Sequence, residues 1–259
     1  MKASDMKPDG RFFGLFVGRS KSGKTGAAVS FPPPVLLLDG DMRAEGILGC
    51  QAWLKDLDKI EIKRFPPNLG FTELEKEIEL LSLSIQARQS PYKTLILDSI
   101  TTINRMFLTD AHELLKGETK GKVRLTGPSD YKYEAEACYQ IFDYLRSIPM
   151  NIIVSAHIID VYGKLDSDKE YSDYGKIGER LSIRDKIGEN IQIFFNEVYR
   201  FSKAETVTNT VKHYVQFRSE LAGTCHSELP NGKVDITGKN FYEVWQSFLK
   251  GERDVQGKN

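Results

Sequence analysis

The chain has 259 residues, 40% of them hydrophobic, and its 36 Lys and Arg residues balance its 36 Asp and Glu residues. This length suffices for one domain with a full core, and the neutral charge excludes nucleic-acid binding through a general excess of positive charge. The three cysteines are widely spaced and form no CxxC pair, a pattern typical of reduced thiols in the cytoplasm.

The ends of the chain are short and polar. We expect tails at residues 1–10 and 251–259 around a single domain at residues 11–250. The sequence contains no apolar run near the roughly 18 residues that a membrane span needs. We therefore expect a cytoplasmic protein without a membrane partner.

Apolar runs alternate with helix-like segments along the chain. Runs bounded by turn residues predict buried strands at residues 12–17, 35–38, 94–97 and 151–154. Helical spacing predicts helices at residues 72–88, about 100–115, 131–147 and from Asn240 onward, and Thr72 with Glu75 matches a capping box. Two β-rich runs, 197–201 and 211–217, predict a hairpin. The order predicts an α/β fold with a mainly parallel sheet, flanking helices and a late antiparallel hairpin.

Residues 18–25, GRSKSGKT, match the GxxxxGK[ST] pattern of a phosphate-binding loop. They lie between an apolar strand and a helix, a context that disfavours the alternative of an ordinary glycine turn. Lys24 is expected to neutralise the β and γ phosphates of ATP, and the Thr25 hydroxyl to bind Mg²⁺. The residues expected at the nucleotide are Gly18, Arg19, Ser20, Lys21, Ser22, Gly23, Lys24, Thr25 and Gly26.

Carboxylates follow two other apolar runs. Asp98 ends TLILD and is expected near Mg²⁺, although it could instead cap the helix that begins near Ile100. The segment LLLDGDMRAEG offers Asp39, Asp41 and Glu45 as groups that orient the attacking water, or as solvated turn carboxylates.

The run that ends VSAHI places Ser155 and His157 near the C-terminal edge of the sheet, where open α/β sheets bind ligands. We expect His157 to contact the γ phosphate. A structural histidine at a strand end is the alternative.

The chain resembles the RecA-like ATPases in the order of five segments, which are GRSKSGKT, LLLDGD, LILDSI, IIVSAH and DKIGENIQIFFNEVYRF. It resembles in particular the compact phage-type proteins grouped with the RecA-like single-strand annealing proteins. The resemblance covers most of residues 12–217 and implies a RecA-like P-loop NTPase core. It also implies ATP hydrolysis and a homo-oligomer, either a ring or a filament, in the host cytoplasm if the chain is phage-encoded.

The resemblance assigns roles to particular residues. The family's catalytic glutamate falls on Asp41, whose side chain is one methylene shorter, so Glu45 is the alternative. The family's polar sensor falls on His157. A basic residue that reaches the γ phosphate of a neighbouring subunit falls on Lys186, with Arg184 second; a solvated charge is the alternative for both.

Two segments are candidates for contact with single-stranded DNA. Residues 116–132 are locally basic, and residues 158–183 lack a regular apolar period and carry tyrosines among charges. Cations and aromatic rings suit a nucleic-acid backbone and its bases. By resemblance these segments hold DNA; the alternative is two solvated loops that become ordered only in an oligomer. The residues expected at DNA are Lys120, Lys122, Arg124, Tyr171 and Tyr174.

These patterns lead to three functional hypotheses. The first is a DNA-stimulated ATPase that promotes annealing or recombination, with a single-strand-binding protein as a further partner. The second is a P-loop kinase for a small acceptor, with residues 158–190 as a lid that contains Arg180 and Arg184. The third is a nucleotide-switched assembly protein with little turnover, which the shortened side chain of Asp41 would explain.

Overall fold

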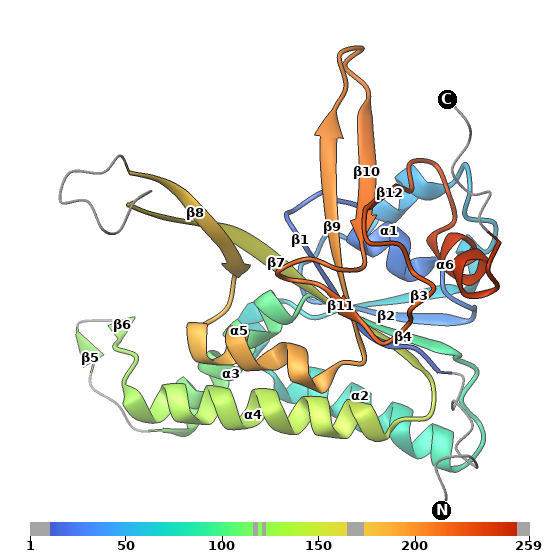
Figure 1. Ribbon diagram of the computed structural model, residues 1–259. Coiled ribbons are helices and arrows are strands. Elements are labelled where there is room, and N and C mark those ends of the chain that lie inside the picture. Colours follow the sequence, from blue (N-terminus) through green and yellow to red (C-terminus); the bar gives the residue numbers. More distant parts are fainter. Residues whose placement is uncertain (1–10, 116–118, 121–122, 165–173, 253–259) are drawn as a thin grey trace, which may run out of the picture.

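The computed structural model describes residues 11–115, 119–120, 123–164 and 174–252 (Figure 1). Its main sheet has the path β12-β10-β9-β1-β7-β4-β2-β3, with β8 paired to β7 and β11 paired to β9. Strands β9, β1, β7, β4, β2 and β3 are parallel to one another, whereas β10 and β12 continue the sheet in antiparallel fashion. The strands are β1 (Phe13–Gly18), β2 (Val35–Asp39), β3 (Ile60–Arg64), β4 (Thr94–Asp98), β7 (Asn151–Lys164), β8 (Tyr174–Leu181), β9 (Glu197–Glu205), β10 (Val211–Gln216), β11 (Gly223–Thr224) and β12 (Lys233–Asp235), and a separate pair is formed by β5 (Thr119–Lys120) and β6 (Val123–Arg124).

Helices cover both faces of the sheet (Figure 1). The α-helices are α1 (Lys24–Val29), α2 (Thr72–Gln86), α3 (Ile100–Leu114), α4 (Pro128–Ser147), α5 (Asp185–Asn190) and α6 (Phe241–Leu249). The short 3-10 helices are η2 (Ala44–Cys50), η3 (Leu57–Lys59), η4 (Pro67–Leu69) and η5 (Ile191–Phe194).

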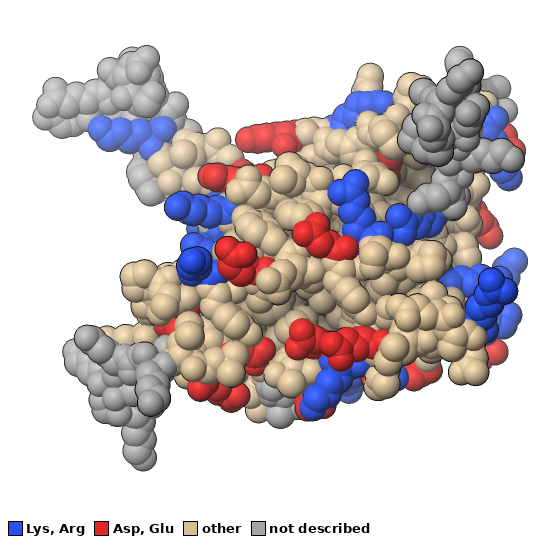
Figure 2. Space-filling model, turned by 90° about the horizontal axis from the view of Figure 1, so that it is seen from below, with Lys and Arg blue, Asp and Glu red and all other residues tan. Residues whose placement is uncertain are grey.

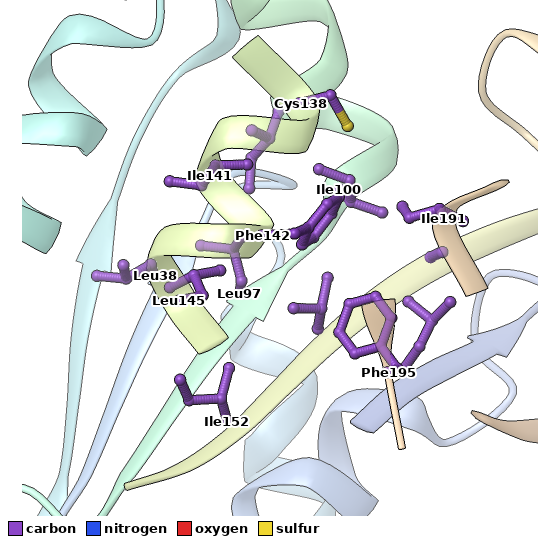
Figure 3. Packing of buried hydrophobic residues seen from close by; sticks show 14 of the residues in the cluster. Leu38, Leu97, Ile100, Cys138, Ile141, Phe142, Leu145, Ile152, Ile191 and Phe195 are labelled. Carbon is purple, nitrogen blue, oxygen red and sulfur yellow. The ribbon is translucent and has the colours of Figure 1, made fainter. Parts of the chain in front are cut away.

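Two hydrophobic clusters, one on each face, hold these layers together. Successive side chains of a strand point to opposite faces, so in β4 Leu95 and Leu97 join the cluster with α2, α3 and α4, whereas Ile96 joins the cluster with α1 and α6. Figure 3 shows Phe142 and Leu145 of α4 near Leu97 of β4 in the first cluster. Both faces are buried, which explains why these strands appear as continuous apolar runs in the sequence.

The expected strands and helices are confirmed, and so is the α/β class with its mainly parallel sheet and late antiparallel hairpin. Helix α4 begins three residues before the predicted start, with Pro128 in its first turn. Proline is favoured there because the amide it lacks would have no partner inside the helix. Strand β3 was not predicted; it is a short edge strand whose sequence IEIKR alternates apolar and polar residues.

The predicted capping box is wrong. Thr72 is already the first residue of α2, and Phe71 occupies the N-cap position without a side-chain cap. The Phe71 amide instead donates a 3.0 Å hydrogen bond to the carboxylate of Asp110 on α3. A carboxylate distant in sequence thus accepts the N-cap amide, the role that the local pattern assigned to Glu75.

The expectation of an irregular loop at residues 158–183 is also wrong for the part of this range that the structure describes. Strand β7 continues beyond the sheet to Lys164 and pairs with β8, from Ile158 with Leu181 to Lys164 with Tyr174. The register shifts between Val161 and Tyr162, and such an irregularity interrupts the alternation by which a strand is recognised. The two strands form a ribbon that projects from the molecule (Figure 1).

Candidate nucleotide-binding site

The sheet topology brings the sequence motifs to one edge. The loop of residues 18–25 joins β1 to α1, and β7 lies between β1 and β4. In register, Gly18 lies beside His157, and Asp39 lies beside Asp98. The loop after β2 is fixed to β4 because the amides of Gly40 and Asp41 donate to the Asp98 carbonyl, at 2.7 and 3.2 Å.

The phosphate loop has a backbone that only a few residue types can adopt. Gly23 has a φ of 98°, in the left-handed region that favours glycine. A Cβ on Gly18 would lie 2.5 Å from the Phe201 carbonyl oxygen and 2.6 Å from Ser22 Oγ. Ser22 Oγ is buried and has no hydrogen-bond partner within the part of the chain that the structure describes. A tight loop with an unpaired buried hydroxyl fits the binding of an oxygen-rich ligand such as a phosphate.

Lys24 is buried and faces the loop. Its Nζ donates hydrogen bonds to the carbonyls of Gly18 (2.8 Å) and Arg19 (3.0 Å), and it lies 3.3 Å from Nδ1 of His157. Burial lowers the pKa of Lys24 to about 8, although the negative charges of Asp98 and Asp41 oppose this shift. A phosphate bound at the loop would strongly stabilise the charged form of this buried ammonium group, because the nearby carboxylates do not compensate fully for its burial.

Thr25 and Asp98 form the part of the site that fits Mg²⁺. Thr25 Oγ1 donates a 2.6 Å hydrogen bond to Asp98 Oδ2, and the hydroxyl of Ser155 donates to Asp98 Oδ1. Hydroxyl and carboxylate oxygens are the donors that this hard cation takes. Mg²⁺ bound here with ATP would supply positive charge to the phosphates. The structure places the Asp98 side chain on Thr25 and Ser155, and α3 has no side-chain cap.

Asp41 and His157 extend this cluster. The two side chains meet at 2.7 Å between Oδ2 and Nε2, and Asp41 Oδ1 also accepts a 2.7 Å hydrogen bond from Ser99. Burial opposes the ionisation of Asp41, but hydrogen bonds from His157, Thr102 and Ser99 hold its pKa well below the usual value. Because Lys24 donates to Nδ1 of His157, a neutral ring carries its proton on Nε2 and donates it to Asp41.

The other two carboxylates of this segment lie apart from the cluster. Asp39 accepts hydrogen bonds from the amides of Arg43 (3.3 Å) and Ala44 (2.9 Å); its pKa is raised, mainly by burial. Glu45 is 61% exposed on η2 and pairs with Arg64 at the edge of the sheet. The structure therefore brings Asp41, and not Glu45, to Lys24 and His157.

The two basic candidates near α5 have different surroundings. Arg184 Nε donates to the buried carboxylate of Glu134 at 2.8 Å, and its guanidinium lies over the ring of Tyr131. Lys186 is exposed in the first turn of α5. Of the two, Lys186 is the one positioned to reach another molecule.

The residues expected at DNA are not described at the level of side chains. Lys122 and Tyr171 lie outside the described residues. The backbones of Lys120, Arg124 and Tyr174 belong to β5, β6 and β8. Figure 1 shows these strands on one side of the molecule, away from α6.

Sequence reasoning missed several residues that support the site. Thr102 and Ser99 bond to Asp41, and Thr101 Oγ1 accepts the amide of His157 at 2.9 Å. All three lie in the run SITT directly after β4. This run of hydroxyl residues behind Asp98 was the available signal. His213 of β10 was also missed; its ring lies 3.1 Å from the place where a Cβ on Gly23 would be.

These features define a P-loop nucleotide-binding protein. A strand leads through a glycine-containing loop into a helix with a buried lysine, and a Thr–Asp pair lies at the same edge of the sheet. The family model described as an AAA domain matches residues 13–240. The chain therefore belongs to this family of P-loop ATPases. A search among curated proteins finds no match to the chain. Within the described residues, no helix is both long and apolar enough to cross a membrane.

Proposed function

We propose that the protein is a RecA-like ATPase that hydrolyses Mg-ATP, binds single-stranded DNA and promotes annealing or recombination as a homo-oligomer. One observation carries the catalytic part of this proposal: Lys24, His157 and Asp41 contact one another in series, Thr25 contacts Asp98, and the Asp41 amide joins the two groups through the Asp98 carbonyl at one edge of the sheet.

Each of these residues has a group suited to hydrolysis. Lys24 would bind the phosphates, and Thr25 with Asp98 would hold Mg²⁺. Asp41 remains ionised and is held by hydroxyl donors, so it can polarise a water molecule or fix the orientation of His157. His157 reaches both Asp41 and Lys24, which suits a residue that contacts the γ phosphate.

The β7–β8 ribbon supports the DNA-binding part. Tyr162 is 57% exposed on this ribbon, and Lys164 and Lys176 are also exposed. An exposed aromatic ring among cations is suited to stack on a base beside a bound backbone. Lys176 pairs with Asp160 and Glu179, so the ribbon is mixed in charge. Figure 2 shows that acidic and basic side chains are also interspersed on the face seen there.

Arg19 connects the two sites. It belongs to the phosphate loop, and its guanidinium pairs with Asp160 of β7 and lies 3.8 Å from Glu179 of β8. A nucleotide that shifts the loop would act on the base of the ribbon through these pairs. The exposed Lys186 is our candidate for the group that reaches the nucleotide of a neighbouring subunit.

The kinase hypothesis has less support. Residues 158–164 and 174–190 form the ribbon and α5 instead of an irregular lid, and Arg184 is engaged with Glu134. A label on the γ phosphate of ATP separates the two functions, because an ATPase transfers it to water and a kinase to a metabolite.

The decisive experiment measures phosphate release from Mg-ATP with and without single-stranded DNA, at low salt where phosphate contacts are strongest. We expect turnover that DNA stimulates and that Lys24→Ala abolishes. Lys55→Ala, an exposed lysine outside the site, is the matched control. DNA-independent turnover would remove the DNA part of the proposal, and turnover equal in Lys24→Ala and the control would remove the ATPase part.

A further inference from the structure

A second cluster of reactive side chains lies at the opposite edge of the sheet from the phosphate loop. It is built on Glu197, the first residue of β9, which lies beside Gly14 of β1. The phosphate loop begins at Gly18, four residues along β1, a distance of about 13 Å in a strand. The cluster is therefore separate from the nucleotide site.

Three different metal-binding groups meet there. Glu197, Cys225 and His226 each offer one ligand atom, and these atoms all lie within 4.8 Å of one another. The Cys225 thiol donates a hydrogen bond of 2.8 Å to Glu197 Oε1, and His226 Nε2 lies 3.6 Å from the same oxygen. Glu197 is only 3% exposed, whereas Cys225 is exposed, so the cluster opens to solvent on one side.

The segment that carries Cys225 and His226 is fixed in place. Strand β11 pairs with β9, with Thr224 beside Glu197. Arg218 donates hydrogen bonds to the carbonyls of His226 (2.7 Å) and Leu229. Glu197 and Cys225 are 28 residues apart in the sequence. Their two segments are therefore joined by the backbone pairing of β11 with β9 as well as by the hydrogen bond between the Cys225 and Glu197 side chains.

We propose that Glu197, Cys225 and His226 bind a zinc ion. Thiolate, imidazole and carboxylate are the groups from which protein zinc sites are built, and a thiolate with an imidazole selects zinc over magnesium or calcium. Zinc bonds of 2.0–2.3 Å in a tetrahedron place the ligand atoms about 3.3–3.7 Å apart. The Glu197–His226 separation already has this value, and the ion would replace the thiol proton that now holds Cys225 closer to Glu197.

The binding step is balanced without a further reactant. The S–H bond of Cys225 breaks, its proton leaves to water, and the sulfur pair forms the bond to zinc. Three ligands leave a fourth position on the exposed side, which water or a group from a partner would fill.

The outer contacts of Glu197 are those expected around a metal ligand. Tyr199 donates a 2.8 Å hydrogen bond to Glu197 Oε2, and Trp245 Nε1 donates to the Tyr199 hydroxyl at 2.9 Å. These contacts orient the carboxylate so that Oε1 faces Cys225 and His226. Groups that orient a ligand in this way typically change metal affinity by about 10–100-fold when they are removed.

The test uses the untagged full chain and zinc alone. Affinity is measured by competition with a chromophoric chelator, and Co²⁺ serves as a probe whose spectrum reports a thiolate ligand and tetrahedral geometry. We expect one zinc ion per chain, and a loss of affinity above about 100-fold in Cys225→Ser and in His226→Gln. Tyr199→Phe would weaken zinc binding by about 10–100-fold, because it acts only through Glu197.

Matched controls are Cys50→Ser and His112→Ala, a cysteine and a histidine outside the cluster. Both should bind zinc like the wild type. Zinc should also raise the melting temperature of the wild type and of the controls, but not that of Cys225→Ser. The proposal is overturned if the wild type binds no zinc, if the cobalt complex lacks the thiolate band, or if Cys225→Ser and Cys50→Ser bind zinc equally.

Discussion

The two halves of β7 have the same backbone and opposite surroundings. In the inner half, from Ile152 to Ala156, every residue is buried, and the strand lies between β1 and β4. In the outer half, from Ile159 to Lys164, the strand is half-buried or exposed and has β8 as its partner. His157 and Ile158 lie where one half gives way to the other.

The difference separates two kinds of charged group. At the inner half, Lys24, Asp98 and Asp41 are buried or nearly so and are held by several hydrogen bonds each, so their charges act in a low dielectric. On the outer half, Asp160 pairs with Lys176 and Arg19 in contact with water. Exposed pairs of this kind contribute little to stability. We infer that the inner half carries chemistry and the outer half carries binding.

Asp41→Asn should have the largest effect and tests the inner half. The amide keeps the shape of the side chain but loses the charge that faces His157. We expect ATP turnover to fall by about 10²–10⁴-fold, the range for loss of a group that directs proton transfer. Steady-state phosphate release at saturating Mg-ATP measures this effect.

Glu45→Gln is the matched control for Asp41→Asn, because Glu45 lies on the same segment but is exposed and pairs with Arg64. Its turnover should stay within about twofold of the wild type, since surface ion pairs have small effects. Equal activity in the two variants would remove Asp41 from the mechanism.

The pKa of Lys24 gives a second test of the inner half. It lies at about 8 in the fold and at 10.5 ordinarily, so between these values the unfolded chain holds more protons and the free energy of unfolding rises with pH. The full difference is about 3 kcal/mol. Lys24→Met lacks this dependence, so its stability relative to the wild type should decline by about that amount from about pH 7 to about pH 10.5.

Urea unfolding of the nucleotide-free protein across this range gives the comparison. Lys55→Met controls for the loss of a lysine, and its stability should follow that of the wild type. Parallel curves for Lys24→Met and the wild type would show that Lys24 is not desolvated in the fold.

Tyr162→Ala tests the outer half. An aromatic ring that stacks on a base contributes about 1–3 kcal/mol, so the affinity for single-stranded DNA should fall by about 5–150-fold. Fluorescence anisotropy with a labelled oligonucleotide at fixed low salt measures this change. Tyr162→Phe keeps the ring and should bind like the wild type; if both variants bind DNA equally, Tyr162 does not stack.

The inner half of the site could be predicted from sequence because its signals are local and ordered. The loop of residues 18–25, Asp98 and His157 each follow an apolar run that stands out in the chain. Parallel strands end at one edge, so the meeting of these residues follows from the topology. The choice of Asp41 over Glu45 needed the structure, because it depends on where η2 turns after β2.

The outer half and the Glu197 cluster could not be predicted in this way. The ribbon loses its alternation at the register shift beside Tyr162, so its sequence resembles that of a loop. Glu197 and Cys225 come together through the pairing of β11 with β9, which only two residues of β11 form, and through the hydrogen bond between their own side chains. Neither segment carries a spacing that marks it as a site, so the information lies in long-range contacts.

Arg19→Gln should have the smallest effect on stability and tests the link between the two halves. Arg19 is exposed and pairs with Asp160, so the free energy of unfolding should change by less than about 1 kcal/mol. If Arg19 transmits the nucleotide state to the ribbon, the variant should lose the difference in DNA affinity between the nucleotide-free and ATP-bound protein. Lys176→Gln removes a pair with the same Asp160 but lies outside the phosphate loop, so it should keep that difference. Coupling lost equally in both variants would mean that the ribbon's own charge balance, and not Arg19, carries the signal.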